Sequence, residues 1–179
     1  MSSQPILVVI TGAPGSGKST LADKLKEQLD WRLIRRDDVK RDLLVELGQS
    51  HEEAGPNINQ VASERFFSLV VDRLNENTNV IAEAAFQHKI WAPWLSRISG
   101  ISKVRLLICE VKTDLAIKRF NRRRVAYPER IQFQGDHLAD GHQLIHDYQK
   151  PNIELPTSTI DTTHDYQPGI TDIADFCRR

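Results

Sequence analysis

The sequence predicts an α/β fold in which a parallel sheet is covered by helices on both faces. Short apolar runs alternate along the chain with segments whose apolar residues recur at helical spacing. The first pair shows this well, since the apolar run 6–11 is followed by Leu21, Leu25 and Leu29. Strands that alternate with helices form parallel sheets, whose ligands bind beyond the carboxyl ends of the strands. Residues that follow the strands are therefore the candidates for a functional site.

The remaining elements can be placed in chain order from the same signals. We expect further strands at 31–34, 80–86, 103–111 and 157–163. Helices are predicted after residue 20 and at 35–47, 58–74, 88–98, 113–124, 137–150 and 169–179. Pro93 should lie in or near the first turn of its helix, and Thr113 with Asp114 should form a cap. Segments rich in turn-forming or polar residues are predicted to be loops, namely 48–57, 75–79 and 127–136.

Length and composition indicate one ordinary globular domain, residues 1–179. The chain is 40% hydrophobic and 27% charged. No apolar run reaches membrane-spanning length, so we expect no membrane partner and a cytoplasmic protein. Cys109 and Cys177 lack metal-ligand spacing, which fits a buried strand thiol and a terminal thiol in a reducing cytosol. The formal net charge of zero gives no indication of nucleic-acid binding.

The most specific motif is the glycine-rich stretch between the first strand and the first helix. It matches G-x-x-x-x-G-K-[ST] without a mismatch, and its residues are Gly12, Ala13, Pro14, Gly15, Ser16, Gly17, Lys18, Ser19 and Thr20. Glycines let backbone N–H groups approach phosphate oxygens, and the helix N-terminus adds its dipole. Lys18 would reach the β- and γ-phosphates of ATP or GTP, and Ser19 would ligate Mg²⁺. Without nucleotide, the Lys18 side chain should point into a solvent-filled loop.

Carboxylates that follow two other strands are candidates for the acceptor and metal sides of the site. Asp37 and Asp38 follow the second strand, where one could orient an acceptor hydroxyl while the other caps the next helix. An aspartate with an ordinary pKa is a weak base for an alcohol, so orientation comes first. Glu83 ends the third strand and could hold Mg²⁺ through water, bind a substrate hydroxyl or pair with an arginine.

A basic run closes the helix after the fourth strand. Arg119, Arg122, Arg123 and Arg124 exceed what a helix C-terminus needs for its dipole. Arginines at this place can neutralise charge that develops on a transferring phosphoryl group. Arg119 and Arg123 are the first choices, because a spacing of four places them on one helix face.

Histidines and aromatic residues elsewhere suggest less specific interpretations. His142 and His146 share a helix face and His137 is near, yet no cysteine or carboxylate set completes a metal site, so surface histidines are favoured. Core packing is similarly favoured over substrate stacking for the aromatic residues that follow the third strand, Phe86, Trp91 and Trp94.

With these residues, the chain resembles the P-loop kinase group, specifically small ATP-binding kinases related to the 5′-hydroxyl kinase domain of polynucleotide kinase and to chloramphenicol phosphotransferase. The resemblance rests on the glycine-rich loop, on Arg36-Asp37-Asp38 and on Lys118-Arg119 with Arg123. It implies a three-layer fold with a five-stranded parallel sheet in the order 2-3-1-4-5 and a mobile lid at about 119–137. Mg-ATP would be the phosphate donor.

The resemblance also implies roles for single residues. Asp37 matches the catalytic aspartate and Arg123 the transition-state arginine, with Lys18 and Arg119 beside them. The acceptor side would hold Asp38, Glu83, Lys40 and Arg41. Lys40 stands where the family has an arginine that binds an acceptor phosphate, and a lysine cannot form the bidentate fork.

Three functions stay open on the sequence. The favoured one is an ATP-dependent kinase acting on a hydroxyl of a small molecule. A 5′-hydroxyl polynucleotide or nucleoside kinase is the alternative enzyme, in which a basic stretch would line the acceptor side: Arg32, Arg35, Arg36, Lys40 and Arg41. The third is a non-catalytic ATP-binding switch, which would not need an aspartate that aligns an acceptor.

Overall fold

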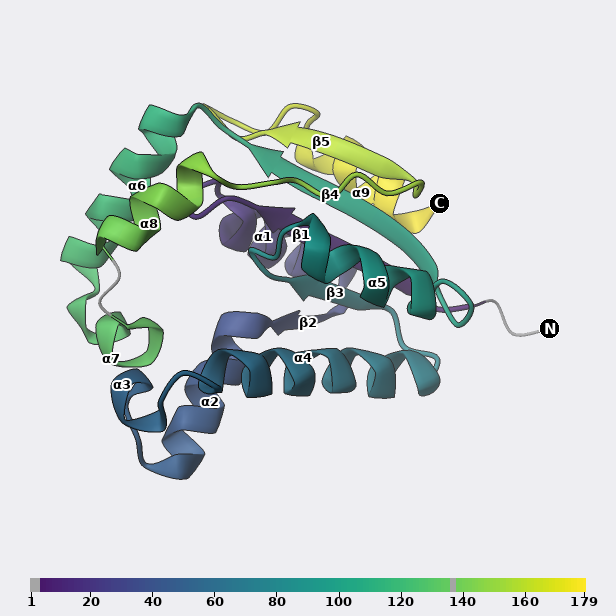
Figure 1. The fold of residues 1–179 in the computed structure, drawn as a ribbon. Helices are drawn as coiled ribbons and strands as arrows, with labels where there is room; N and C mark the ends of the chain where they lie inside the picture. Colours follow the sequence, from purple (N-terminus) through teal and green to yellow (C-terminus); the bar gives the residue numbers. More distant parts are fainter. Residues whose placement is uncertain (1–3, 136–137) are drawn as a thin grey trace.

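The computed structural model describes residues 4–135 and 138–179, and the predicted parallel sheet lies at its centre (Figure 1). Its strands are β1 (Ile6–Gly12), β2 (Arg32–Arg35), β3 (Val80–Glu83), β4 (Lys103–Glu110) and β5 (Thr157–Asp161). The order is β2-β3-β1-β4-β5 and every pairing is parallel. The predicted strand order is therefore confirmed. All five carboxyl ends lie at one edge of the sheet.

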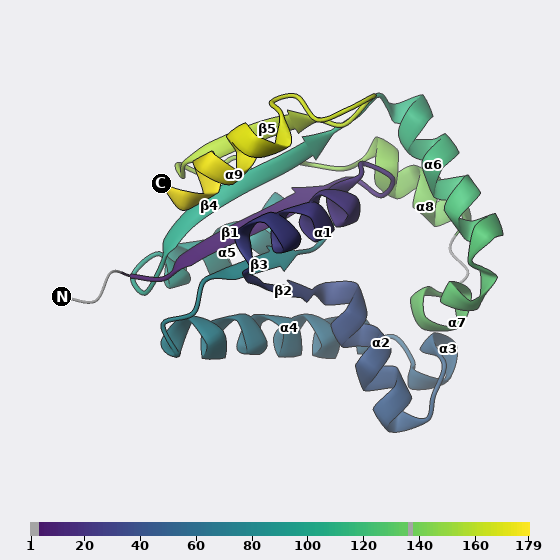
Figure 2. The ribbon, with the colours of Figure 1, turned by 180° about the vertical axis from the view of Figure 1, so that it is seen from behind.

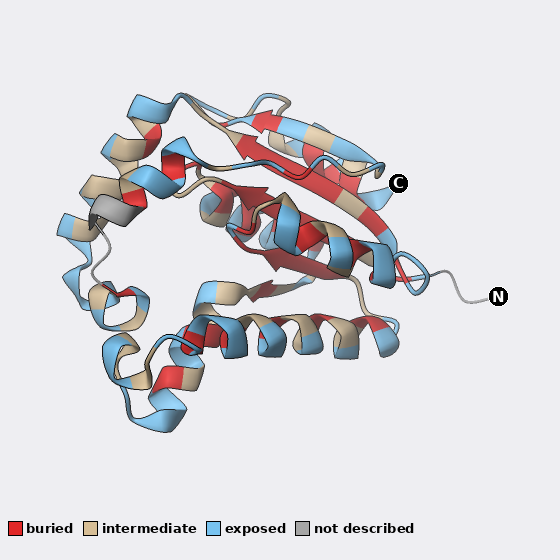
Figure 3. Ribbon diagram, in the orientation of Figure 1, coloured by how far each residue is buried: buried red, intermediate tan, exposed pale blue. Residues whose placement is uncertain are grey.

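Helices cover both faces of the sheet, as the alternation predicts. On one face lie α4 (Ile58–Asn75) and α5 (His88–Ile98), and on the other lie α1 (Lys18–Leu29) and α9 (Ile170–Arg178), as Figures 1 and 2 show from opposite sides. Each face has its own apolar core, and in Figure 3 the central strands are almost wholly buried. The buried faces follow from sequence, since Leu21, Leu25 and Leu29 of α1 are at most 8% exposed.

The predicted aromatic core is present between α4, α5 and β3. Trp91 is fully buried and Phe86 is 8% exposed, and their ring centroids lie 5.2 Å apart in an edge-on arrangement. Trp94 stacks on Phe67 at 4.5 Å. Pro93 lies inside α5 rather than in its first turn, because the helix begins at His88.

Two groups of helices extend beyond the carboxyl edge of the sheet. One holds α2 (Arg36–Leu47) and α3 (His51–Ala54), and the other α6 (Thr113–Ala126), the 3₁₀ helix η1 (Pro128–Arg130), α7 (Ile131–Gln134) and α8 (Leu138–His146). The two groups meet where α7 contacts both α2 and α3, as Figure 1 shows.

Some short elements depart from the expectation. The predicted loop 48–57 contains α3, whose capping box joins Ser50 and Glu53. The predicted loop 127–136 contains η1 and α7, and His137 lies outside the described residues. Thr113 and Asp114 are the first residues inside α6, whose N-cap is Lys112 with no side-chain cap. In the described part of the chain, no helix has the length and apolar character to cross a bilayer.

Candidate active site

The glycine-rich loop is held by close packing against the two neighbouring elements. Gly15 has a φ of 80°, and a Cβ there would lie 2.2 Å from the Ala116 carbonyl oxygen, so no larger residue fits. The loop closes on itself where the Ser16 N–H donates to the Ala13 carbonyl at 3.1 Å. The Thr162 hydroxyl, beyond β5, donates to the Ser16 carbonyl at 2.7 Å. The loop is thus fixed between α6 and the segment after β5.

Lys18 is folded over this loop instead of pointing into solvent. Its side chain is buried, and Nζ donates to the Ala13 carbonyl oxygen at 3.4 Å. The expectation of a solvent-facing lysine was therefore wrong, because the loop carbonyl offers the ammonium an acceptor close to the main chain. The ammonium already lies beside the loop whose N–H groups would receive phosphate.

Ser19 and Glu83 meet at the end of β3. The Ser19 hydroxyl donates to Glu83 Oε2 at 3.2 Å. Glu83 is 5% exposed, and its burial raises the pKa of the carboxyl, although Lys18 and Arg35 oppose that rise. A hydroxyl and a carboxylate are hard oxygen donors of the kind that Mg²⁺ takes beside substrate phosphates. The donor set therefore fits Mg²⁺ bound together with a nucleotide.

Arg35 joins this pair to the first helix. As the last residue of β2, its guanidinium donates to the Ser19 carbonyl at 3.1 Å and contacts Glu83 at 3.5 Å and Asp23. From the sequence, Arg35 was predicted only to be part of a basic stretch. These contacts come from two elements outside β2, namely α1 with Ser19 and Asp23 and β3 with Glu83, so spacing alone gave no signal for them.

Asp37 and Asp38 are placed differently although they are neighbours. Asp38 is an ion-pair partner of Arg41 at 3.0 Å and lies 3.8 Å from Arg35. The Asp37 side chain is 64% exposed, with Arg36 at 3.5 Å and Gln134 of α7 also at 3.5 Å. Neither carboxylate caps α2, whose N-cap is Arg35, and both lie in its first turn. Asp37 is therefore the more accessible carboxylate.

Lys40 and Arg41 also differ sharply in their surroundings. Lys40 is 3% exposed, and burial lowers the pKa of its ammonium to about 8, with Arg36 as a second cause. Arg41 is half exposed and engaged with Asp38 and Asp42. Both lie on α2 after the aspartates, yet only Arg41 reaches solvent with its charged group.

The two favoured arginines of α6 have different neighbours in spite of their spacing. Arg119 donates to the carbonyl oxygens of Thr162 and Thr163 at 2.8 and 3.0 Å, which holds it against the segment after β5. Burial and Arg130 lower the pKa of Arg123, while Asp37 and Glu83 raise it. Arg123 is thus within electrostatic reach of both carboxylates, and Arg119 is not directed toward them.

A cavity of about 360 Å³ lies next to the glycine-rich loop on the Arg119 side. Its lining comes from the loop, α1, α6 and the segment after β5: Gly17, Thr20, Lys24, Arg119, Thr162, His164, Asp165 and Tyr166. Neither Thr162 nor Tyr166 was among the site residues predicted from the sequence. The available signal was their place after the last strand, at the ligand-binding edge of a parallel sheet.

The histidines show no metal site in the described residues. His142 Nε2 bonds to Asn121 Oδ1 at 2.8 Å and thereby joins α8 to α6. Within the described ranges, no three His, Cys, Asp or Glu side chains gather as metal ligands would. Cys109 and Cys177 are both buried free thiols.

The strand order and the glycine-rich loop give the chain the fold of the P-loop kinase group. Residues 7–146 match the AAA_33 family, an AAA domain, so the chain belongs to that family. A cytidylate kinase of Ignicoccus hospitalis is 37% identical over 93 residues, covering 49% of this chain and 52% of that protein. The chain therefore matches about half the length of this relative.

Solved structures show the same fold. A candidate kinase from Chloroflexus aurantiacus has a TM-score of 0.83 at 23% identity, over 98% of each chain. A chain of the Pnkp1/Rnl/Hen1 RNA repair complex has a TM-score of 0.57 at 20% identity, over 88% of this chain and 51% of that one. The resemblance to the P-loop kinase group is thereby confirmed.

Proposed function

We propose that this kinase transfers the γ-phosphate of ATP to a hydroxyl group of a small molecule. The observation that carries the proposal is the exposed carboxylate of Asp37, which lies in the first turn of α2 directly beyond β2 and 3.5 Å from the side-chain amide of Gln134 in α7. Phosphoryl transfer requires an aligned acceptor and positive charge around the transferring group. This edge of the sheet offers both.

The nucleotide would lie across the glycine-rich loop. Its phosphates would accept hydrogen bonds from loop N–H groups and from Lys18, which would leave the Ala13 carbonyl to meet them. The cavity beside Arg119 and Tyr166 has room for the base and ribose. Ser19 would hold Mg²⁺ directly and Glu83 through water, and the bound ion would neutralise the β- and γ-phosphates.

Asp37 would orient the acceptor. Its exposed carboxylate can accept a hydrogen bond from a hydroxyl, turn the oxygen toward the γ-phosphorus and take the proton late in the transfer. Arg123 would stabilise the charge that develops on the phosphoryl oxygens. Arg119, held against Thr162 and Thr163, would support the nucleotide from the lid side.

The charges on the acceptor side favour a hydroxyl over a phosphate acceptor or a nucleic-acid end. Arg35 and Arg41 are each engaged with carboxylates, and Arg36 with Asn59 and Asp37. Lys40 is buried, so little of this basic stretch faces an incoming phosphate. Asp37 and Glu83 would also repel an anionic acceptor. Asp38, Lys40 and Arg41 would then shape the acceptor side rather than bind a phosphate.

A screen for acceptor-dependent ADP release tests the proposal. The panel should contain hydroxylated metabolites and antibiotics, nucleosides, 5′-hydroxyl oligonucleotides and nucleoside monophosphates, each with Mg-ATP. We expect turnover with an uncharged hydroxyl compound and loss of transfer in Asp37→Asn. Turnover restricted to nucleoside monophosphates or oligonucleotides would refute the acceptor class. Different ATP and ADP conformations without transfer to any acceptor would favour a switch.

A further inference from the structure

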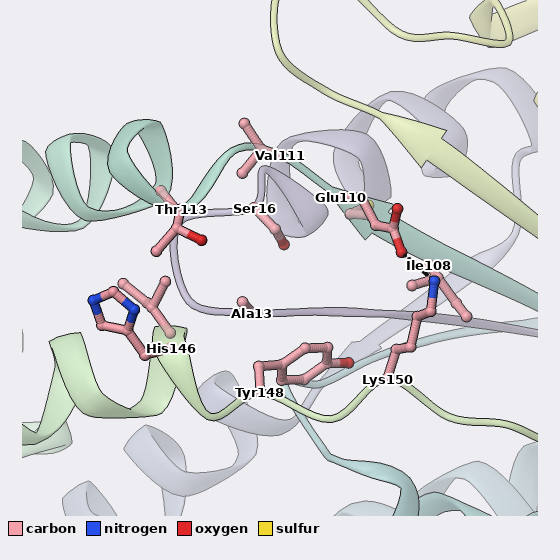
Figure 4. A pocket seen from close by; sticks show the side chains of 12 residues that line it. Ala13, Ser16, Ile108, Glu110, Val111, Thr113, His146, Tyr148 and Lys150 are labelled. Atoms are coloured by element: carbon pink, nitrogen blue, oxygen red, sulfur yellow. Dashed lines mark hydrogen bonds and ion pairs between the residues drawn. The ribbon is translucent and has the colours of Figure 1, made fainter.

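A second cavity of about 350 Å³ lies behind the glycine-rich loop, between β4, α6 and the chain that follows α8 (Figure 4). Its lining comes from the glycine-rich loop, the end of β4, the start of α6, the end of α8 and the chain after α8. Its size is in the range of small-molecule sites. It shares no described lining residue with the cavity beside Arg119.

This cavity is separate from the proposed reaction. Lys18, Asp37 and Arg123 are absent from its described lining, which meets the proposed nucleotide site through Ala13 and Ser16 of the glycine-rich loop. Tyr148, on the chain after α8, has its hydroxyl 2.9 Å from the Thr11 hydroxyl, and this bond fixes that chain against the end of β1. A molecule in the cavity would therefore not be placed for phosphorylation.

One polar group in the cavity wall has no partner. Ser16 is 1% exposed, and its Oγ makes no hydrogen bond to any described residue. A buried hydroxyl without a partner is costly, and a ligand that bonds to it would remove that cost. Figure 4 shows the Ser16 side chain at the cavity among Ala13, Glu110 and Thr113.

The rest of the lining limits the chemistry of the ligand. Ile108, Val111 and Ile145 give an apolar wall, and the charges of Glu110 and Lys150 are paired with each other at 2.7 Å. An ion in the cavity would have to break that pair to be neutralised. An uncharged molecule with an apolar body and a hydrogen-bonding group meets the wall and Ser16 without such a cost.

We propose that this cavity binds a small uncharged amphipathic molecule that tightens nucleotide binding. Ala13 and Ser16 belong both to the cavity wall and to the glycine-rich loop, and the Ser16 N–H to Ala13 carbonyl bond closes the loop between them. A ligand that fills the space behind the loop restrains it before the nucleotide arrives, which lowers the ordering cost of binding. The coupling rests on the proposed nucleotide site, whereas ligand binding itself does not.

2-Naphthol serves as the probe, and 2-naphthalenesulfonate is its anionic match. Titration followed by probe fluorescence and by protein NMR should give a dissociation constant below about 1 mM for 2-naphthol and much weaker binding of the anion. Val111→Phe should abolish binding by filling the cavity, while Val125→Phe is the matched control because Val125 is 84% exposed. Ser16→Ala should weaken binding by about two- to tenfold through loss of one hydrogen bond.

Linkage gives the second readout. Saturating 2-naphthol should tighten nucleotide binding at least about fivefold, and saturating nucleotide should tighten 2-naphthol binding by the same factor. Undiminished 2-naphthol binding in Val111→Phe or Ser16→Ala would overturn the site, and phosphorylation of 2-naphthol would make it an acceptor pocket instead. Binding at the site with unchanged or weakened nucleotide affinity would overturn the coupling. Failure of nucleotide to bind at all would contradict the proposed function while the probe titration still decides the cavity.

Discussion

Replacing Arg35 with methionine should destabilise the protein by about 3 kcal/mol. The charged hydrogen bond to the Ser19 carbonyl contributes about 1.5–3 kcal/mol. The pair with the half-exposed Asp23 adds less than about 1 kcal/mol. Removing one partner of a buried pair costs up to about 3–5 kcal/mol, and Glu83 avoids part of this cost by taking up a proton.

The destabilisation caused by Arg35→Met should also depend on pH. Burial already raises the pKa of Glu83, and Arg35 opposes that rise. Without Arg35 the folded protein should hold the Glu83 proton to a higher pH than the unfolded chain does. The free energy of unfolding should then fall as pH rises from the ordinary glutamate pKa of about 4.3 through the raised folded value, and Arg35→Met should deepen that fall.

Urea denaturation at pH 5 and pH 8 measures both effects. Arg41→Met is the matched control, because Arg41 is half exposed and its pairs with Asp38 and Asp42 should contribute under about 1 kcal/mol. In a Glu83→Gln background, Arg35→Met should cost less and lose its pH dependence. Equal losses for the two arginine variants, or additivity with Glu83→Gln, would refute the reasoning.

Three further predictions concern the site. Lys18→Ala should abolish turnover and lower nucleotide affinity while circular dichroism shows an intact fold; wild-type affinity would contradict its phosphate role. Arg123→Ala should lower kcat by about a thousandfold or more with little change in ATP affinity. Asp37→Asn should lower transfer to the acceptor and leave ATP binding unchanged. Steady-state kinetics and nucleotide titration test both variants. Because the pKa of Lys40 is lowered to about 8 in the folded protein, the unfolded chain binds more protons between pH 8 and about 10.4, and the free energy of unfolding should rise over that range. Urea titrations of Lys40→Met should show no such rise.

The sequence predicts the sheet and the loop well because both depend on local patterns. The apolar run 6–11 and the glycine-rich motif define a strand, a turn and a helix within one short stretch, and the structure has β1 and α1 there. The packing of Trp91 and Phe86 likewise follows from their large apolar surfaces. A local signal was also present for α3, because Ser50 and Glu53 have the spacing of a capping box and form one in the structure. The glycine and proline residues of 48–57 nevertheless led to the prediction of a loop.

The contacts of the charged residues could not be predicted in the same way. Arg119 and Arg123 are four residues apart on α6, yet Arg119 donates to carbonyl oxygens after β5 while the Arg123 guanidinium lies over the Phe120 ring, 5.9 Å from its centroid. Their directions depend on how α6 sits over the sheet edge, which no spacing within α6 encodes. The position of the Lys18 side chain depends similarly on its hydrogen bond to the Ala13 carbonyl. Arg35 contacts Ser19 of α1 and Glu83 of β3, so its position depends on how those two elements pack.

The junction of β2 and α2 has no connecting loop, since the strand ends at Arg35 and the helix begins at Arg36. Asp37 therefore stands two residues from a strand whose register is fixed by β3, and Arg35 pairs in that register with Glu83. An insertion between Arg35 and Arg36 would shift Asp37 away from the sheet edge, while the strand register would keep Arg35 beside Glu83. With the proposed role of Asp37, changes in length are easier to accommodate in α3 and α7, where they leave the distance from Asp37 to the sheet unaltered. For protein engineering, those segments are the places to diversify, and residues 35–37 are the ones to leave intact.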